Sequence, residues 1–140
     1  MMFFPRSLLA LLAIVFPAGT LASDAADREL PAMSGTFFGS VPLAGCTHAD
    51  ALLRLGPDRR YAMQAHCRTT LEDLPLEQGD WSMEWNGTCV RLVPDGLAGA
   101  REFAIALDDL LVLAEGSCIE PVEDPRGRSL HRAQPTPWAR

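Results

Sequence analysis

Lysine is absent from this sequence of 140 residues, in which all 12 basic side chains belong to arginine. The arginines are scattered, and 18 acidic residues bring the formal net charge to −6 at pH 7. Nucleic acids and anionic membranes are bound through clustered basic side chains, because each phosphate contact needs a nearby positive charge. The sequence therefore predicts no nucleic-acid partner and no polybasic membrane patch.

Sequence signatures of catalysis are also absent. The chain contains no Gly-x-Ser-x-Gly elbow, which presents the nucleophile of many hydrolases, and no His-Glu-x-x-His zinc motif. Its acidic pairs, Glu72-Asp73 and Asp108-Asp109, fall in segments that resemble loops and turns, where acidic residues are common. We therefore expect a protein without enzymatic activity.

Long apolar runs are scarce, and the longest lies near the start of the chain. Residues 7–16 are almost entirely apolar, follow one arginine, and precede Pro17 and several small residues up to Ala22. This is the layout of a secretory signal, and the run is too short for a transmembrane helix. We predict a signal peptide over residues 1–22, export to the periplasm or the medium, and no stable membrane anchor.

A second short motif, Leu43-Ala44-Gly45-Cys46, has the spelling of a lipoprotein cleavage box. Such a box works directly after the apolar run, and here more than twenty residues, several of them charged, intervene. Short motifs often match by chance. We therefore expect Cys46 to belong to a folded domain and to carry no lipid.

The part of the chain after the predicted signal has about 118 residues, which is enough for one domain with a modest core. We expect a flexible segment over residues 23–33, the domain over residues 34–132 and a disordered tail over residues 133–140. An even number of cysteines in an exported chain predicts disulfides, and their spacing fits no compact zinc site. Every pairing stays open among Cys46, Cys67, Cys89 and Cys118.

From residue 34 onward, short segments alternate between apolar and polar side chains, and none has convincing helical periodicity. Alternation with a period of two is typical of strands with one buried face. Seven or eight such strands with tight turns predict a sheet that closes on itself. We therefore predict an all-β fold, a small antiparallel up-and-down β-barrel. The expected strands lie near residues 35–41, 52–55, 61–67, 80–85, 88–92, 102–107, 110–114 and 129–133.

The clearest hairpin spans residues 80–92 and turns at Asn86-Gly87, a pair that accepts the positive φ angles of a two-residue turn. The resulting register points Cys89 outward. The cross-strand pairs that it predicts are Trp81–Leu92, Met83–Val90 and Trp85–Thr88.

The predicted interior contains most of the aromatic side chains. Such an interior is either a filled core or a barrel with a cavity for an apolar ligand, and short strands favour the filled core. The expected interior aromatics are Phe37, Tyr61, Trp81, Trp85 and Phe103.

Three segments, GTFFGSVPLAGC, LLRLGPDRRYAM and GDW, follow one another in residues 35–81. Their order and spacing resemble the N-terminal domain of NlpE-type copper-resistance lipoproteins, which begins with a Gly-x-aromatic-x-Gly-x-aliphatic-Pro strand and a Cys-x-x-Cys motif. The resemblance extends over about residues 34–113. The matching positions are Gly35, Phe37, Gly39, Val41, Pro42, Cys46, Leu53, Leu55, Asp58, Tyr61, Met63, Gly79, Asp80 and Trp81.

The resemblance implies a small barrel of lipocalin-like character and a link to copper tolerance or envelope stress sensing. One departure limits it, because Leu43 stands where the family has its first cysteine. A redox or metal role that needs both thiols of the Cys-x-x-Cys motif is therefore not carried over to this chain.

The candidate metal ligands are two cysteines and two histidines, namely Cys46, His48, His66 and Cys67. Thiolate and imidazole suit copper and zinc, and an up-and-down barrel would bring the two segments to the same rim. The alternative, favoured because exported thiols normally oxidise, is that the cysteines form disulfides and the histidines are solvated. No cofactor is expected, and copper enters only through the resemblance.

We therefore expect an exported, non-enzymatic β-barrel protein that resembles the NlpE N-terminal domain, with a role in copper tolerance or envelope stress sensing. Two alternatives remain open. One is a barrel that binds a small apolar ligand, and the other is an interaction or inhibitor module that docks a protein partner through its loops.

Overall fold

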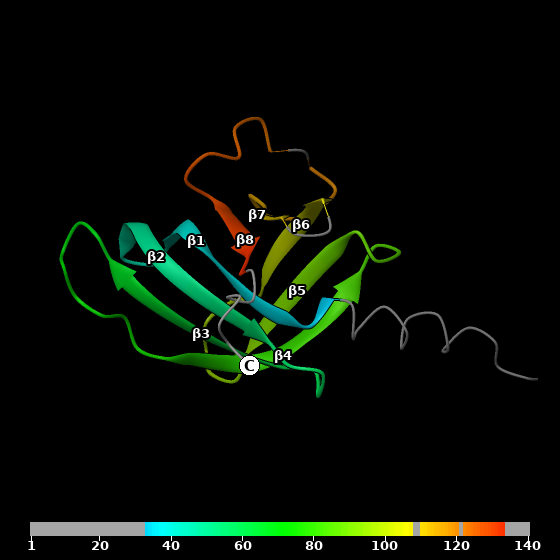
Figure 1. Cartoon of the computed structure of the whole chain (residues 1–140), viewed down its shortest axis with the longest axis horizontal. Coiled ribbons are helices and arrows are strands. Elements are labelled where there is room, and N and C mark those ends of the chain that lie inside the picture. The colour runs from blue at the N-terminus through cyan, green and yellow to red at the C-terminus, as the bar shows by residue number, and fades with distance from the viewer. Residues whose placement is uncertain (1–32, 108–109, 121, 134–140) are drawn as a thin grey trace, which may run out of the picture.

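The computed structural model describes residues 33–107, 110–120 and 122–133, and their strands form a closed antiparallel barrel in chain order (Figure 1). The predicted all-β, up-and-down architecture is confirmed. The predicted signal peptide at residues 1–22, most of the segments at 23–33 and 133–140, and the Asp108-Asp109 turn lie outside the described residues. The strands are β1 (Gly35–Leu43), β2 (Cys46–Leu55), β3 (Arg60–Cys67), β4 (Glu77–Glu84), β5 (Cys89–Pro94), β6 (Arg101–Leu107), β7 (Leu110–Leu113) and β8 (Ser129–Arg132).

The core forms because the apolar members of each alternating strand point to the same interior. Phe37 on β1 pairs with Leu53 on β2, and Leu53 pairs in turn with Met63 on β3. The largest side chains of this interior, among them Trp81 and Phe103, are at most 2% exposed. Burial of apolar surface on this scale is the main driving force for folding.

The barrel closes where β1 meets β8, and Gly39 makes that contact possible. Gly39 pairs with Leu130, and a Cβ atom at Gly39 would lie 2.1 Å from the carbonyl oxygen of Ser129. Only a residue without a side chain allows so close an approach of two backbones. This explains in physical terms the second glycine of the GTFFGSV segment.

The predicted hairpin register is confirmed for Trp81–Leu92 and Met83–Val90. The prediction that Trp85 lies in the interior is wrong, since its side chain is 51% exposed. Trp85 and Asn86 both adopt positive φ angles, 53° and 56°, so the turn begins one residue earlier than expected. A residue in the left-handed region leaves the strand, and its side chain leaves the alternating pattern.

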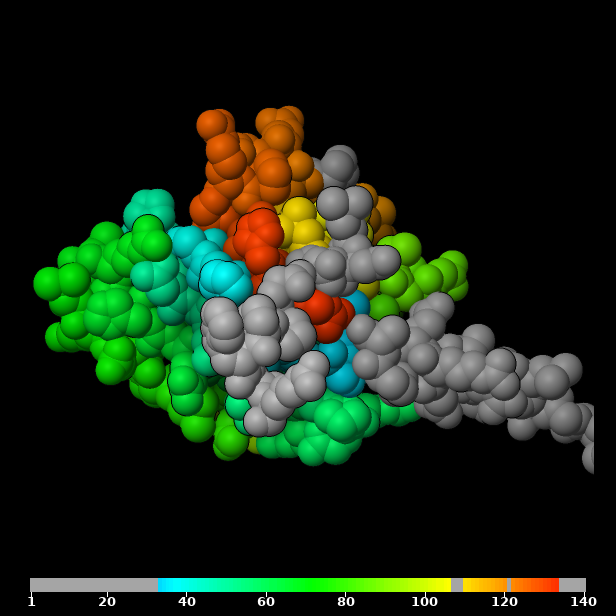
Figure 2. Space-filling view, viewed as in Figure 1, coloured from blue at the N-terminus to red at the C-terminus, as the bar shows by residue number. Residues whose placement is uncertain are grey.

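The two ends of the barrel differ in their connections. One end, termed the mouth end, carries the β1–β2 turn and the β3–β4, β5–β6 and β7–β8 loops. The opposite end, termed the turn end, carries the short β2–β3 and β4–β5 connections. Figures 1 and 2 show the β3–β4 loop (green) and the β7–β8 loop (orange) projecting from the body of the molecule.

No helix in the part of the chain that the structure describes is long and apolar enough to cross a membrane.

Candidate ligand site at the mouth of the barrel

A hollow of about 520 Å³ lies at the mouth end and is termed the mouth hollow. Its walls come from the β1–β2 turn, the inner side of β3, the β3–β4 loop and the β5–β6 loop. A hollow of this size lies within the range of sites for small molecules. Its apolar lining includes Leu43, Met63, Ala65, Leu74, Leu76, Pro94 and Leu97.

Inward side chains on β2 and β3 become smaller toward the mouth end. On β2 the inward residues are Leu55 and Leu53 near the turn end, then Ala51 and Ala49 near the mouth. On β3, Ala65 occupies the corresponding inward position near the mouth, directly opposite Ala51. Of these short residues only Ala65 lines the mouth hollow, whose remaining lining comes from the β1–β2 turn, Met63, the β3–β4 loop, the start of β4, the β5–β6 loop and Arg101.

Two charged side chains, Glu77 at the start of β4 and Arg101 at the start of β6, line the mouth hollow. Nη1 of Arg101 donates a hydrogen bond to Oε2 of Glu77. The two side chains keep only 17% (Glu77) and 20% (Arg101) of their surface exposed. A pair with so little solvent is screened weakly, so each charge depends on the other for its stability. This ion pair is termed the inner pair.

Tyr61 on β3 supports the inner pair from the core side. Its hydroxyl donates to Oε2 of Glu77 at 3.1 Å. Burial, together with the negative charge of Glu77, raises the pKa of Tyr61 well above its usual value. The phenol therefore stays protonated near neutral pH and remains a hydrogen-bond donor to the carboxylate.

The arrangement suits binding better than chemistry. Apolar walls would accommodate a hydrocarbon group, and the inner pair offers hydrogen-bonding groups at one place on the wall. Among the described residues that line the mouth hollow, none is a serine, cysteine or histidine. The carboxylate of Glu77 is already engaged by the side chains of Arg101 and Tyr61.

The sequence interpretation missed the inner pair, although a signal for it was present. Glu77 stands two residues before Gly79 and four before Trp81, so the alternation of β4 points it inward. Arg101 precedes Phe103 in the same way on β6. The sequence of each segment therefore shows a charged residue at an inward position of a strand. It does not show that these two residues meet.

The predicted metal ligands do not come together as one group. Cys46 and Cys67 form a disulfide with an S–S distance of 2.04 Å, so neither sulfur is a thiolate in this state. His48 and His66 lie on the outer side of β2 and β3, and Nδ1 of His66 is 2.9 Å from Oδ1 of Asp73. Among the described residues, the four side chains form no compact ligand set.

A second disulfide joins Cys89 to Cys118. Cys89 lies on the outer side of β5, as the hairpin register predicts, yet it is fully buried. The β7–β8 loop covers it, and the backbone N–H of Cys118 donates to Oε2 of Glu102 on β6 at 2.8 Å. Glu102 lies close to both sulfurs, but sulfurs that are bonded to each other are poor metal ligands.

A second hollow, of about 760 Å³, lies on the outside of the barrel over β1, β2 and β3 and is termed the outer groove. At one end of it Arg68 donates to Asp50 at 2.8 Å, and this bond lowers the pKa of the Asp50 carboxyl. Leu74 and Leu76 line both hollows, so the β3–β4 loop forms the wall between them. The exposed apolar side chains of the groove are Phe38, Leu52 and Leu76.

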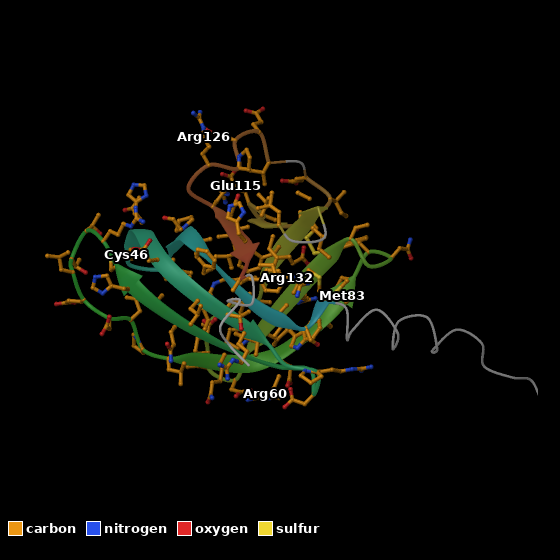
Figure 3. The ribbon with its side chains drawn as sticks, in the orientation of Figure 1. Cys46, Arg60, Met83, Glu115, Arg126 and Arg132 are labelled. Atoms are coloured by element: carbon orange, nitrogen blue, oxygen red, sulfur yellow. A yellow bond between two sulfur atoms is a disulfide. The ribbon has the colours of Figure 1, made fainter. Side chains whose placement is uncertain are left out.

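Figure 3 shows how the mouth end and the turn end are separated in space. Cys46, at the start of β2, and Arg60, at the start of β3, are labelled and lie well apart. The disulfide of Cys46 therefore braces the mouth end, where the hollow opens, and leaves the turn end to side-chain packing.

No family model matches the sequence, and no match was found among curated proteins. A predicted lipoprotein from Shewanella oneidensis has a similar solved structure, with a TM-score of 0.58 and 16% sequence identity. The match covers 78% of this chain and 95% of the other. At this identity the likeness shows a shared fold and nothing about function.

The Cpx pathway activator NlpE from Escherichia coli is also among the similar solved structures. Its TM-score is 0.48 at 19% identity, and the match covers 65% of this chain and 47% of the NlpE chain. The present chain therefore spans about half the length of that protein.

Proposed function

We propose that the protein is an exported, non-enzymatic binding barrel that takes a small, largely apolar molecule into its mouth hollow. The observation that carries the proposal is the hollow itself, with apolar walls and the Glu77–Arg101 pair at one place on its lining. Barrels of this size bind ligands in this way when their interior is not completely filled.

Export is supported by two independent features. The chain begins with the predicted signal peptide, and its four cysteines form two disulfides. Disulfides form and persist in the periplasm and outside the cell, and they are rare in the reducing cytosol. The proposal therefore places the protein in the cell envelope or the surrounding medium.

Titration of the oxidised, purified protein with N-phenyl-1-naphthylamine, an uncharged probe that fluoresces in apolar surroundings, tests the proposal. We expect saturable binding of one probe molecule per chain. Leu43→Asp, which places a charge on a half-buried position that lines only this hollow, is expected to weaken binding about tenfold, because an apolar contact is replaced by a charge that must be desolvated.

Leu71→Asp is the matched control for this titration. Leu71 is an exposed leucine of the β3–β4 loop that lines neither hollow, so its replacement should leave probe affinity unchanged. Absence of saturable binding to the wild-type protein, or equal weakening by both variants, would refute a ligand site in the mouth hollow.

A role in copper tolerance or envelope stress sensing is the second candidate. It is supported by the sequence resemblance over residues 34–113 and by the direct contact of Cys46 with Cys67. Copper(I) binding at these two cysteines would require reduction of this disulfide, because copper(I) binds thiolates. We expect copper(I) to bind only after reduction, and to bind much more weakly in Cys46→Ser than in Cys89→Ser. Equal copper(I) affinity in the two variants would exclude the Cys46 site.

A further inference from the structure

The inner pair indicates which polar group the ligand carries, an inference that rests on the proposed function. We infer that the mouth hollow selects amphipathic molecules whose head group is uncharged and both donates and accepts hydrogen bonds, such as a long-chain alcohol or primary amide. The same hydrocarbon chain with a carboxylate or an ammonium group is expected to bind less well.

The charged side chains that line the mouth hollow are paired. Glu77 and Arg101 line the hollow as a bonded pair and together contribute no net charge. Asp95 also lies on the lining, but Arg60, which contacts Asp80 as well, holds the Asp95 carboxylate through two contacts, at 2.8 Å and 2.5 Å. An ionised head group would therefore be stripped of water without finding an unopposed charge in return.

The inner pair has hydrogen-bonding capacity beyond the contact between its two members. A guanidinium has five N–H donors, and the contact of Arg101 with Glu77 uses one nitrogen, Nη1. The contacts of Arg101 and Tyr61 with Glu77 both fall on Oε2, and a carboxylate can accept further bonds at its other oxygen. A donor and an acceptor thus lie side by side, which matches a hydroxyl or an amide.

An ionised head group would have to disrupt the inner pair in order to bind. A ligand carboxylate could bind Arg101 only beside the like charge of Glu77, and an ammonium could bind Glu77 only beside Arg101. Either arrangement places like charges close together at a site with little solvent, where repulsion is screened weakly. An alcohol or amide can add its bonds without breaking the ion pair.

Displacement of N-phenyl-1-naphthylamine by four ligands with the same ten-carbon chain tests the inference. The ligands are 1-decanol, decanamide, decanoate and decylamine, each below its micelle-forming concentration at pH 7, with the oxidised full chain. We expect the alcohol and the amide to displace the probe at concentrations about tenfold lower than the two ionised ligands, because only the neutral head groups bind without like-charge repulsion.

Glu77→Gln adds a readout that a merely structural role would not change. Glutamine keeps the size of the side chain and a carbonyl acceptor for Arg101 and Tyr61, but it leaves the positive charge of Arg101 unopposed. Decanoate is then expected to become the best of the four ligands. Glu84→Gln on the outer side of the same strand is the matched control and should keep the wild-type order.

The outcomes separate the two levels of the proposal. Failure of the probe itself to bind would refute the proposed function. If the probe binds, three results would overturn the inference and leave the binding function intact. Decanoate or decylamine could displace the probe as effectively as 1-decanol, or none of the four ligands could displace it. The third such result is a ligand order in Glu77→Gln that equals the wild-type order.

Discussion

The turn end and the mouth end of this barrel share the same eight strands but are stabilised in different ways. At the turn end large side chains fill the interior, and Nε1 of Trp81 donates to the carbonyl of Gly56 in the β2–β3 turn at 2.8 Å. At the mouth end loops and the starts of β4 and β6 surround a hollow, and a disulfide and an ion pair support the strands. The comparison teaches that one small barrel can be filled by large side chains at one end and still leave space between its loops at the other.

The largest expected effect is at the turn end. Trp81→Ala should lower the free energy of unfolding by about 3–5 kcal/mol, because it removes a fully buried indole and leaves a cavity. Trp81→Phe should cost less, since it keeps most of the volume and loses mainly the bond to Gly56. Chemical denaturation measures both values.

Trp85→Ala is the control for Trp81→Ala, because Trp85 is half-exposed in the β4–β5 turn. Its replacement should change stability by less than about 0.5 kcal/mol. Similar losses at Trp81 and Trp85 would contradict the contrast between a packed interior and an exposed turn.

The second effect concerns the mouth end. Replacing Cys46 and Cys67 together by serine should cost about 3 kcal/mol, because the bond closes a loop with a sequence separation of 21. Hydrogen exchange should accelerate mainly at the mouth ends of β2 and β3 and much less around Trp81. Uniform acceleration over the whole barrel would mean that the two ends unfold as one unit.

The third effect is loss of the inner pair. Arg101→Met should destabilise the protein by about 1–3 kcal/mol, because Glu77 would keep a charge in a site with little solvent. Arg101→Met combined with Glu77→Gln should recover part of this loss, since no unpaired charge remains. A double variant less stable than Arg101→Met alone would show that the pair acts through packing rather than charge.

The smallest effect is expected from the exposed ion pair between Arg60 at the start of β3 and Asp95 directly after β5. Two hydrogen bonds from Arg60 lower the pKa of the Asp95 carboxyl in the folded protein. The pair therefore stabilises the fold at pH values above the pKa of Asp95 in the unfolded chain. This stabilisation is lost as the pH falls through the pKa of Asp95 in the folded protein. In Arg60→Met the pKa of Asp95 should rise toward its ordinary value, as measured by NMR titration. The stability difference from wild type should shrink below pH 4. A constant difference across the acid range would exclude this electrostatic contribution.

Some features of the fold and site follow from short stretches of sequence. The alternation of Phe37 and Val41 on β1 predicts their burial, and the Asn86-Gly87 pair predicts a hairpin with Trp81 opposite Leu92. The prediction failed at Trp85, because the turn takes up four residues, 85–88, in place of the two of the Asn-Gly pair, so Trp85 and Thr88 form no strand pair. Local patterns indicate which side of a strand is buried but are less reliable at its ends.

The sequence by itself determined which segments are extended and which side chains point inward, because alternation is a property of neighbouring residues along one strand. It also carried the decrease in side-chain size on β2, from Leu55 to Ala49. Only the tertiary structure decided that Cys46 bonds to Cys67 and that Glu77 meets Arg101, 24 residues away. The reason is that the tilt and stagger of strands in a closed barrel set which inward residues lie at the same height, and no single strand contains that information.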